Sequence, residues 1–374
     1  VKGTQRCIFS TSVVDTTIEM IIATGGSVYI YDGSTLTLQS FSANTVTYLN
    51  SKSIYDGGSN TFSVTGAGGA SDITSSGVAE SSPDTLLRCY AFGQLCYMFG
   101  SETIEPFYDN GAGSPPLVRM SGGIMQKGLG ALYSVAETDQ FLYFLGDDFN
   151  VYQISQTTIA PVSTPAIVTQ ISQLDTANAV AYTMVIDGQD FYIINFGDDE
   201  LSYAYSEQTR EWFNLSSGVT DGRYSVSSYI RAYDKDIGAD YSTGNAIEIS
   251  TTAYDDLGDT IQRVRQLPPL NSSNLGFGAG QRLLMDKANF ILQTGVGIAS
   301  GQGSDPQIMV QYSKDGEDWS TERWLDIGRM GETLIKVEFQ GMVSFYDISF
   351  RITVSDPVFC SLHDGSISIK EYGY

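Results

Sequence analysis

The hydrophobic positions of this chain fall in short runs that are separated by tight turns. Three stretches repeat one order of elements: a short strand, a turn, a strand rich in aromatic residues, a turn of glycine and acidic residues, and a further strand. The aromatic strands are Leu95–Phe99, Phe141–Leu145 and Phe191–Phe196. Short apolar and aromatic runs bounded by turn residues are typical of β-strands in antiparallel hairpins. The pattern therefore predicts a chain built from consecutive β-meanders.

The spacing of these stretches indicates a repeat. The glycine after each aromatic strand falls at Gly100, Gly146 and Gly197, which are 46 and 51 residues apart, and a partial copy places Gly33 67 residues before Gly100. Blades of four-stranded β-propellers repeat about every 40–50 residues, because one meander cannot bury both of its faces alone. The alternative is a β-sandwich with similar hairpins. We also expect Gly146 and Gly197 to adopt positive φ, since each separates an aromatic strand from an acidic tip.

Two stretches interrupt this pattern. Residues 57–77 are rich in Gly, Ser and Thr, and we expect an exposed loop there. Residues 267–280 contain two adjacent prolines, which cannot donate to a β-ladder, among Gly, Ser and Asn. We assign this second stretch to a linker between a β-propeller-like domain at residues 1–266 and a smaller C-terminal domain at residues 281–374.

The C-terminal domain shows a different pattern, in which apolar and polar positions alternate. The alternating stretches are Gln307–Ser313, Ile335–Phe339 and Ser349–Val354. Strict alternation is typical of strands with one buried and one solvated face. The sequence therefore predicts an all-β chain in which propeller-like repeats of antiparallel meanders are followed by a C-terminal β-sandwich.

Composition agrees with this fold class. The 374 residues include 39 glycines, 23 tyrosines, 18 phenylalanines and 3 tryptophans, which supply turn and strand positions. Long runs of Ala, Leu, Glu and Lys, which favour helices, are absent from the sequence. No apolar run approaches the roughly 18 residues of a membrane-spanning helix, so we expect no membrane partner.

Motifs of enzymes and metal sites are absent from the sequence. A Ser-His-Asp or Cys-His device would have to use the single histidine, His363, which lies in a turn sequence near the C-terminal end. Phosphate-binding loops and the zinc-protease and serine-hydrolase motifs do not occur. None of the four cysteines forms a CxxC pair; Cys89 and Cys96 flank a predicted turn, and we expect free, core-facing thiols. We expect no cofactor, no metal and no enzymatic activity.

Paired acidic residues recur where hairpin tips are predicted. The pairs are Asp147–Asp148, Asp198–Asp199 and Asp255–Asp256. Paired carboxylates also perform glycoside hydrolysis, so a propeller glycosidase acting on host polysaccharide is the enzymatic alternative. Aspartate in a turn hydrogen-bonds its own backbone, and we interpret the pairs as turn residues.

Several segments, taken in their order and spacing, resemble a known family. They are Phe99–Phe107, Gly122–Ala136, Phe141–Ile154, Tyr241–Ile249, Tyr254–Gly258, Arg263–Pro268, Val310–Ser320, Trp324–Gly328 and Arg351–Pro357. Together they resemble the tail-hub family of short-tailed bacteriophages, also called the packaged DNA stabilisation proteins. The resemblance spans about Ser76 to Ile369. The N-terminal stretch departs from the family pattern, because members usually begin with a longer segment before the first blade.

The resemblance implies a structural subunit of a tail hub or nozzle ring. Such a ring has six copies, attaches below the portal and adaptor, contacts the distal tail needle or other tail proteins, retains packaged DNA and forms part of the ejection channel. Double-stranded DNA passes through without specific binding. The implied location is the virion tail, assembled in the bacterial host cytoplasm, and no catalytic residue is implied. A host-receptor-binding tail protein is the non-enzymatic alternative.

The charge of the chain bears on this function. With 43 acidic and 20 basic residues, the formal net charge is −23. Such a surface repels phosphate at long range, which excludes tight wrapping around DNA. An acidic wall suits a channel that must not grip DNA, and our candidates for it are Asp147, Asp148, Asp198 and Asp199. The alternative is that the acidity serves solubility.

Overall fold

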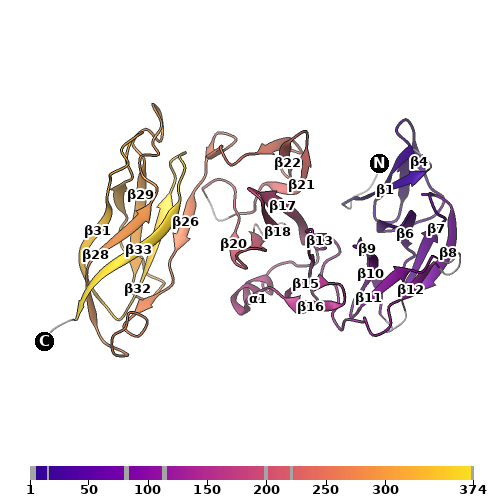
Figure 1. Ribbon diagram of the computed structural model, residues 1–374, viewed down its shortest axis with the longest axis horizontal. Coiled ribbons are helices and arrows are strands. Elements are labelled where there is room, and N and C mark those ends of the chain that lie inside the picture. Colours follow the sequence, from indigo (N-terminus) through magenta and orange to yellow (C-terminus); the bar gives the residue numbers. More distant parts are fainter. Residues whose placement is uncertain are drawn as a thin grey trace. The chain divides into compact units, whose positions relative to one another are not determined.

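The computed structural model describes residues 6–14, 17–79, 84–111, 116–197, 201–219 and 222–371 (Figure 1). The chain divides into two compact units. The first comprises Val1–Leu215 and Gly222–Glu248, and the second Ser216–Asp221 and Ile249–Tyr374.

The first unit contains, among its described residues, five four-stranded sheets and one three-stranded sheet, each an antiparallel meander in chain order. We call these sheets blades 1 to 6. Blade 1 contains β1 (Ile8–Val14), β2 (Thr17–Ala23), β3 (Val28–Tyr31) and β4 (Leu36–Leu38), and blade 2 contains β5 (Val46–Leu49), β6 (Lys52–Asp56), β7 (Thr61–Thr65) and β8 (Ile73–Val78). Blade 3 contains β9 (Leu86–Phe92), β10 (Leu95–Gly100), β11 (Ile104–Asp109) and β12 (Leu117–Arg119), and blade 4 contains β13 (Ala136–Glu137), β14 (Leu142–Leu145), β15 (Val151–Ser155) and β16 (Thr158–Pro161). Blade 5 contains β17 (Val180–Ile186), β18 (Gln189–Phe196), β19 (Leu201–Ser206) and β20 (Trp212–Asn214), and blade 6 contains β21 (Val226–Ala232), β22 (Lys235–Asp240) and β23 (Ala246–Ile249).

The first strands of the blades lie next to one another. Strand β1 contacts β5, β5 contacts β9, β13 contacts β17, and β17 contacts β21. Two hydrogen bonds between neighbouring blades each join residues that are 44 positions apart: Cys89 N donates to Thr45 Oγ1, and Tyr182 OH donates to Val226 O. At the ends of the series, the Arg6 guanidinium donates to Ser227 O over 2.9 Å. This is the arrangement of a β-propeller, in which first strands surround an axis.

Among the described residues, a hydrophobic core lies between blades 1 and 2, between 2 and 3, between 3 and 4, and between 4 and 5. Along β10, Cys96 and Met98 join a core with blade 2, whereas Tyr97 and Phe99 join a core with blade 4. Successive side chains of a strand point to opposite faces, so a strand between two blades must be apolar at every position. The uninterrupted aromatic runs of the sequence are therefore the strands that lie between two neighbouring blades.

One short helix, α1 (Pro165–Ile171), connects blades 4 and 5. Thr164 caps its N-terminus by accepting a hydrogen bond from Ile167 N, and Ile167 and Ile171 are buried in the core shared by these blades. No helix among the described residues has the length and hydropathy of a membrane-spanning segment.

The second unit contains a β-sandwich and a short hairpin. Its strands are β24 (Asp255–Asp256), β25 (Asp259–Thr260), β26 (Arg263–Gln266), β27 (Leu270–Asn271), β28 (Leu283–Leu292), β29 (Gln307–Ser313), β30 (Arg323–Asp326), β31 (Val337–Phe345), β32 (Asp347–Val354) and β33 (Leu362–Glu371). One sheet has the order β26-β32-β29-β30, with β27 also paired to β32, and the facing sheet has the order β31-β28-β33. Phe290 and Phe339 of the second sheet pack edge-on against Phe350 of the first, with ring centroids 5.9 and 6.1 Å apart.

The predicted fold class, an all-β chain with propeller repeats before a β-sandwich, is confirmed. Residues 267–280, which the sequence pattern assigned to a linker, include β27, and Leu267, Leu270, Leu275 and Phe277 pack against the sandwich core. All four cysteines are free, and Cys89 and Cys96 are buried, as expected.

Two local predictions were wrong. The stretch 57–77 is not a loop, because it contains β7 and most of β8, with Phe62 and Val64 buried in the core shared with blade 3. Gly197 has φ +37°, as expected, but Gly146 does not have positive φ. Gly146 is required for space: an added Cβ would lie 2.8 Å from the Tyr152 ring and 2.9 Å from Asp148 Oδ1.

A tight passage between blades 3 and 4 generates a prediction. The segment around Gly128 passes beside the turn after β10, and a Cβ on Gly128 would overlap the backbone carbonyl of Ser101. We expect Gly128→Ala to lower the free energy of unfolding by about 1–3 kcal/mol, because backbone must shift to admit the methyl group. Urea denaturation measures this. Gly69→Ala is the matched control, since its nearest neighbours would lie 3.7 Å away; equal stability of the two variants would contradict the packing of this passage.

Candidate functional site

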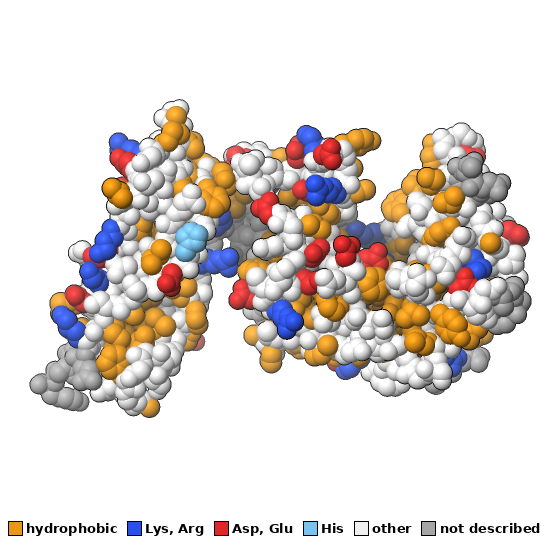
Figure 2. Space-filling view, viewed as in Figure 1, with side chains coloured by type: hydrophobic (Ala, Val, Ile, Leu, Met, Phe, Trp, Pro, Cys, Tyr) orange, Lys and Arg blue, Asp and Glu red, His pale blue; other side chains and the backbone are white. Residues whose placement is uncertain are grey.

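Charged side chains are dispersed over the surface of each unit. On the face shown in Figure 2, the blue Lys and Arg side chains lie singly or in small groups, and no continuous basic stripe crosses either unit. A phosphate-binding groove needs such a stripe. The more distinctive chemistry lies inside the first unit.

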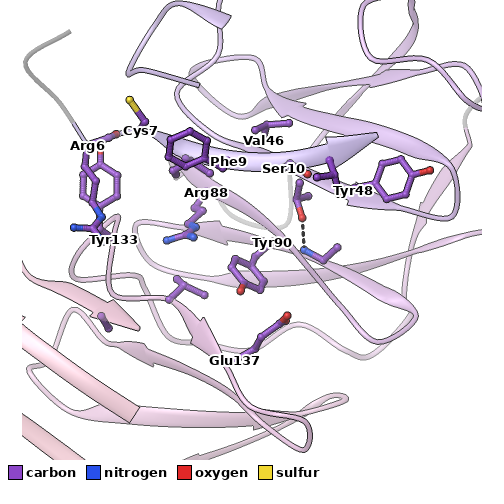
Figure 3. Close-up of a pocket in the computed structure, with 16 residues that line it drawn as sticks. Arg6, Cys7, Phe9, Ser10, Val46, Tyr48, Arg88, Tyr90, Tyr133 and Glu137 are labelled. Atoms are coloured by element: carbon purple, nitrogen blue, oxygen red, sulfur yellow. Dashed lines mark hydrogen bonds between the residues drawn. The ribbon is translucent and has the colours of Figure 1, made fainter. Parts of the chain in front are cut away.

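A cavity of about 530 Å³ lies on the axis of the propeller (Figure 3). Its walls come from the first strands of blades 1 to 5 and from the segments that lead into β1 and β13. Some side chains that line the cavity, such as Ile8 and Val46, also belong to a core between blades. Polar side chains line it as well, and the charged ones are Arg6, Arg88 and Glu137.

Arg88 is the most buried charge of the cavity, at 8% exposure. Its guanidinium donates to Leu132 O over 2.7 Å and lies 5.0 Å from the centroid of the Tyr90 ring, a cation–π contact. Arg6 enters from the segment before β1, and its backbone carbonyl accepts a hydrogen bond from Tyr133 OH. Figure 3 shows Arg6 beside Tyr133, and Arg88 near Tyr90.

Burial and like charge determine the electrostatics of this cavity. Burial lowers the pKa of Arg88, and the nearby Arg6 lowers it further. Burial also lowers the pKa of Arg6, and Arg223 adds to that effect. Tyr90 has its pKa raised to about 12, first by burial and then by the charge of Glu137. Among the described residues, no carboxylate forms an ion pair with Arg6, Arg88 or Arg223.

The cavity lacks the components of the enzymatic alternative. Glycoside hydrolysis by the usual route needs two carboxyl groups that flank the bond to be cut, whereas Glu137 is the one carboxylate among the lining residues. The histidine His363 belongs to β33 of the second unit.

The predicted channel acids are only partly described. Asp147 is exposed, and its Oδ1 accepts a hydrogen bond from Gly128 N over 3.3 Å. Asp148 forms an ion pair with Lys127, with 2.6 Å between the oxygen and Nζ, and accepts a hydrogen bond from Tyr152 OH over 2.7 Å. Asp198 and Asp199 lie outside the described residues. Asp147 therefore carries the uncompensated charge of the pair after β14.

The contact with Lys127 helps to explain why the pKa of Asp148 is lowered. Burial alone would raise its pKa, but the hydrogen bonds from Lys127 and Tyr152 outweigh burial and hold the pKa below its usual value. The third acidic pair, Asp255–Asp256, has a turn residue, since Asp255 Oδ1 accepts a hydrogen bond from Gly258 N over 2.8 Å in the turn between β24 and β25. That geometry matches the interpretation of the acid pairs as turn residues.

The two cavity arginines were missed by sequence reasoning. The sequence offers one indication of Arg88, because this residue is the one charge within the apolar run of β9. Such a charge is either paired or functional once the strand is buried. The sequence offers no indication of Arg6, because its position on the axis depends on the first and last blades of the propeller coming together.

Comparison with known proteins gives two family matches. Residues 1–254 match the family model described as "Bacteriophage P22 Gp10, beta-propeller", and residues 273–370 match the one described as "Bacteriophage P22 Gp10, beta-sandwich". No curated protein matches the chain.

Solved structures show weak overall likeness. BamB from Moraxella catarrhalis has 10% identity and a TM-score of 0.37, with 64% of this chain and 80% of that chain covered. Hsv2 from Kluyvelomyces marxianus has 9% identity and a TM-score of 0.38, covering 60% and 69%. The Pan2 WD40 domain of Neurospora crassa has 9% identity and a TM-score of 0.39, covering 62% and 71%. None of these likenesses bears on function.

The Lys127–Asp148 pair generates a prediction about pH. A carboxyl with a lowered folded-state pKa stabilises the fold above the unfolded-state value near 3.9, and this contribution is lost as the pH falls below it. The pair is about one-third exposed, so we expect Asp148→Asn to cost only about 0.5–1 kcal/mol at pH 7. The difference from the wild type should vanish near pH 2.

Urea denaturation across this pH range measures the effect. Asp147→Asn is the control and should change stability less, because its side chain has no ion pair among the described residues. A pH-independent cost of Asp148→Asn would show that the ion pair is not its cause.

Proposed function

This chain belongs to the bacteriophage P22 Gp10 family, and we propose that it forms a ring below the portal and adaptor that retains packaged DNA and lines part of its exit path. Membership of the family makes it a structural component of a phage tail. The observation that carries the proposal is that the propeller and sandwich models match in order and together account for most of the chain.

Side chains on the propeller axis support a path for DNA outside it. Phe9, Tyr48 and Tyr90 line the cavity on the axis. We therefore place the path between copies of the chain, of which the family resemblance implies six.

The proposed partners follow from this position. One face of the ring would bind the adaptor, and the other the tail needle or other distal proteins, after assembly in the host cytoplasm. We propose no catalytic step, since the cavity offers a single carboxylate among its lining residues.

The acidic balance suits a path that does not grip DNA. Each phosphate neutralised by Lys or Arg releases counterions and adds affinity, and therefore drag. A wall of acids repels the backbone over a Debye length of about 8–10 Å. We propose the tip acids Asp147, Asp148, Asp198 and Asp199 for this wall, with Asp147 carrying a free charge where Asp148 is paired to Lys127.

Charge reversal tests this proposal. Virions carrying lysine at the four tip acids should eject DNA more slowly at low salt and recover as salt screens the new attraction, measured as DNA release over time at several salt concentrations. The control reverses four exposed acids of the second unit, Asp286, Glu317, Asp318 and Glu322, with the same change in net charge.

The outcomes separate the possibilities. Slow, salt-sensitive ejection by the tip variant alone supports an acidic wall at these positions. If the tip variant assembles and ejects DNA as the wild type does, these acids do not line the path.

A further inference from the structure

The cavity on the propeller axis contains two arginines, Arg6 and Arg88, that form no ion pair with a described residue, and one carboxylate, Glu137, also lines it. The chain has more than twice as many acidic as basic residues, so a basic side chain should find an acidic neighbour readily. Seven ion pairs occur among the described residues, yet none includes Arg6 or Arg88. The two arginines share a wall of the same cavity (Figure 3).

Among the described residues, each guanidinium donates to one backbone carbonyl. A guanidinium has five N–H donors. Arg88 donates to the carbonyl of Leu132, and Arg6 to that of Ser227. A buried guanidinium without a carboxylate is costly, and Arg88 is buried while Arg6 is half-buried. Burial lowers the pKa of both side chains; the charge of Arg6 lowers the pKa of Arg88 further, and the charge of Arg223 lowers that of Arg6.

We propose that the axial cavity binds a small molecule through an oxyanion group, a phosphate or a carboxylate, held between Arg6 and Arg88. Planar guanidinium groups match such oxygens with pairs of hydrogen bonds. The volume of about 530 Å³ lies within the range of small-molecule sites. Tyr90 lines the same cavity and offers a further hydroxyl.

The bound anion would also brace the ring of blades. Arg6 precedes blade 1 and is hydrogen-bonded to Ser227 of blade 6, while Arg88 belongs to blade 3. A ligand held by both arginines therefore links blade 3 to the place where blades 1 and 6 meet. Binding to the folded state alone raises the melting temperature with ligand concentration.

Calorimetry and thermal melting of the purified full chain test the proposal. The probes are inorganic phosphate and citrate, each compared with sodium chloride at equal ionic strength. We expect phosphate, citrate or both to bind and to raise the melting temperature above that in chloride. Arg6→Gln and Arg88→Gln should each weaken binding about tenfold or more, the usual effect of losing a charge-assisted hydrogen bond.

Arg231→Gln is the control, because Arg231 is exposed on β21 and does not line the cavity; it should bind as the wild type does. If Arg88→Gln fails to fold, Arg6→Gln alone decides. The proposal is overturned if neither probe stabilises the chain beyond chloride, or if Arg6→Gln binds the probes with wild-type affinity.

Discussion

The structure depends on one constraint: a blade placed between two others must bury both of its faces. A lone meander has one face to bury and one to leave in water, but the inner strands of these blades have no solvent face. Leu142 and Phe144 of β14 pack toward blade 3, and Tyr143 and Leu145 toward blade 5. Burial of four such side chains is worth several kcal/mol, and it is available only when both neighbouring blades are in place.

This constraint also determines where polar groups can lie. Side chains on the first strands that point to the axis can carry charge, and the buried Arg88 and the nearby Arg6 lie there. Within the blades, buried acids have partners: Asp56 accepts hydrogen bonds from Asn44 N and Thr45 N, and Glu105 forms an ion pair with Arg119. Other acids lie in turns, where Asp148 and Asp255 hydrogen-bond to neighbouring groups. The formal net charge of −23 agrees with the proposed role beside DNA.

The sequence predicts features that depend on residues close together in the chain better than features that depend on distant residues. Aromatic strands such as Phe141–Leu145 were predictable because burial on both faces leaves an uninterrupted apolar run. The stretch 57–77 was misread because its strands are rich in Ser, Thr and Gly, and few of its residues, among them Phe62, Val64 and Ala70, belong to a core. Gly146 was predicted to have positive φ, yet glycine is needed there because a Cβ would overlap the ring of Tyr152. The cavity was out of reach, because it is assembled from strands far apart in the sequence.

The central claim is that this propeller and sandwich form one subunit of a ring, with the path for DNA between copies. Native mass spectrometry of the full chain bound to its portal–adaptor assembly tests it most directly. The account predicts a single species with six copies of the chain per assembly, and loss of copies only when the ring as a whole dissociates. A single copy bound to the assembly, or a chain that stays monomeric beside it, would contradict the ring and with it the proposed path.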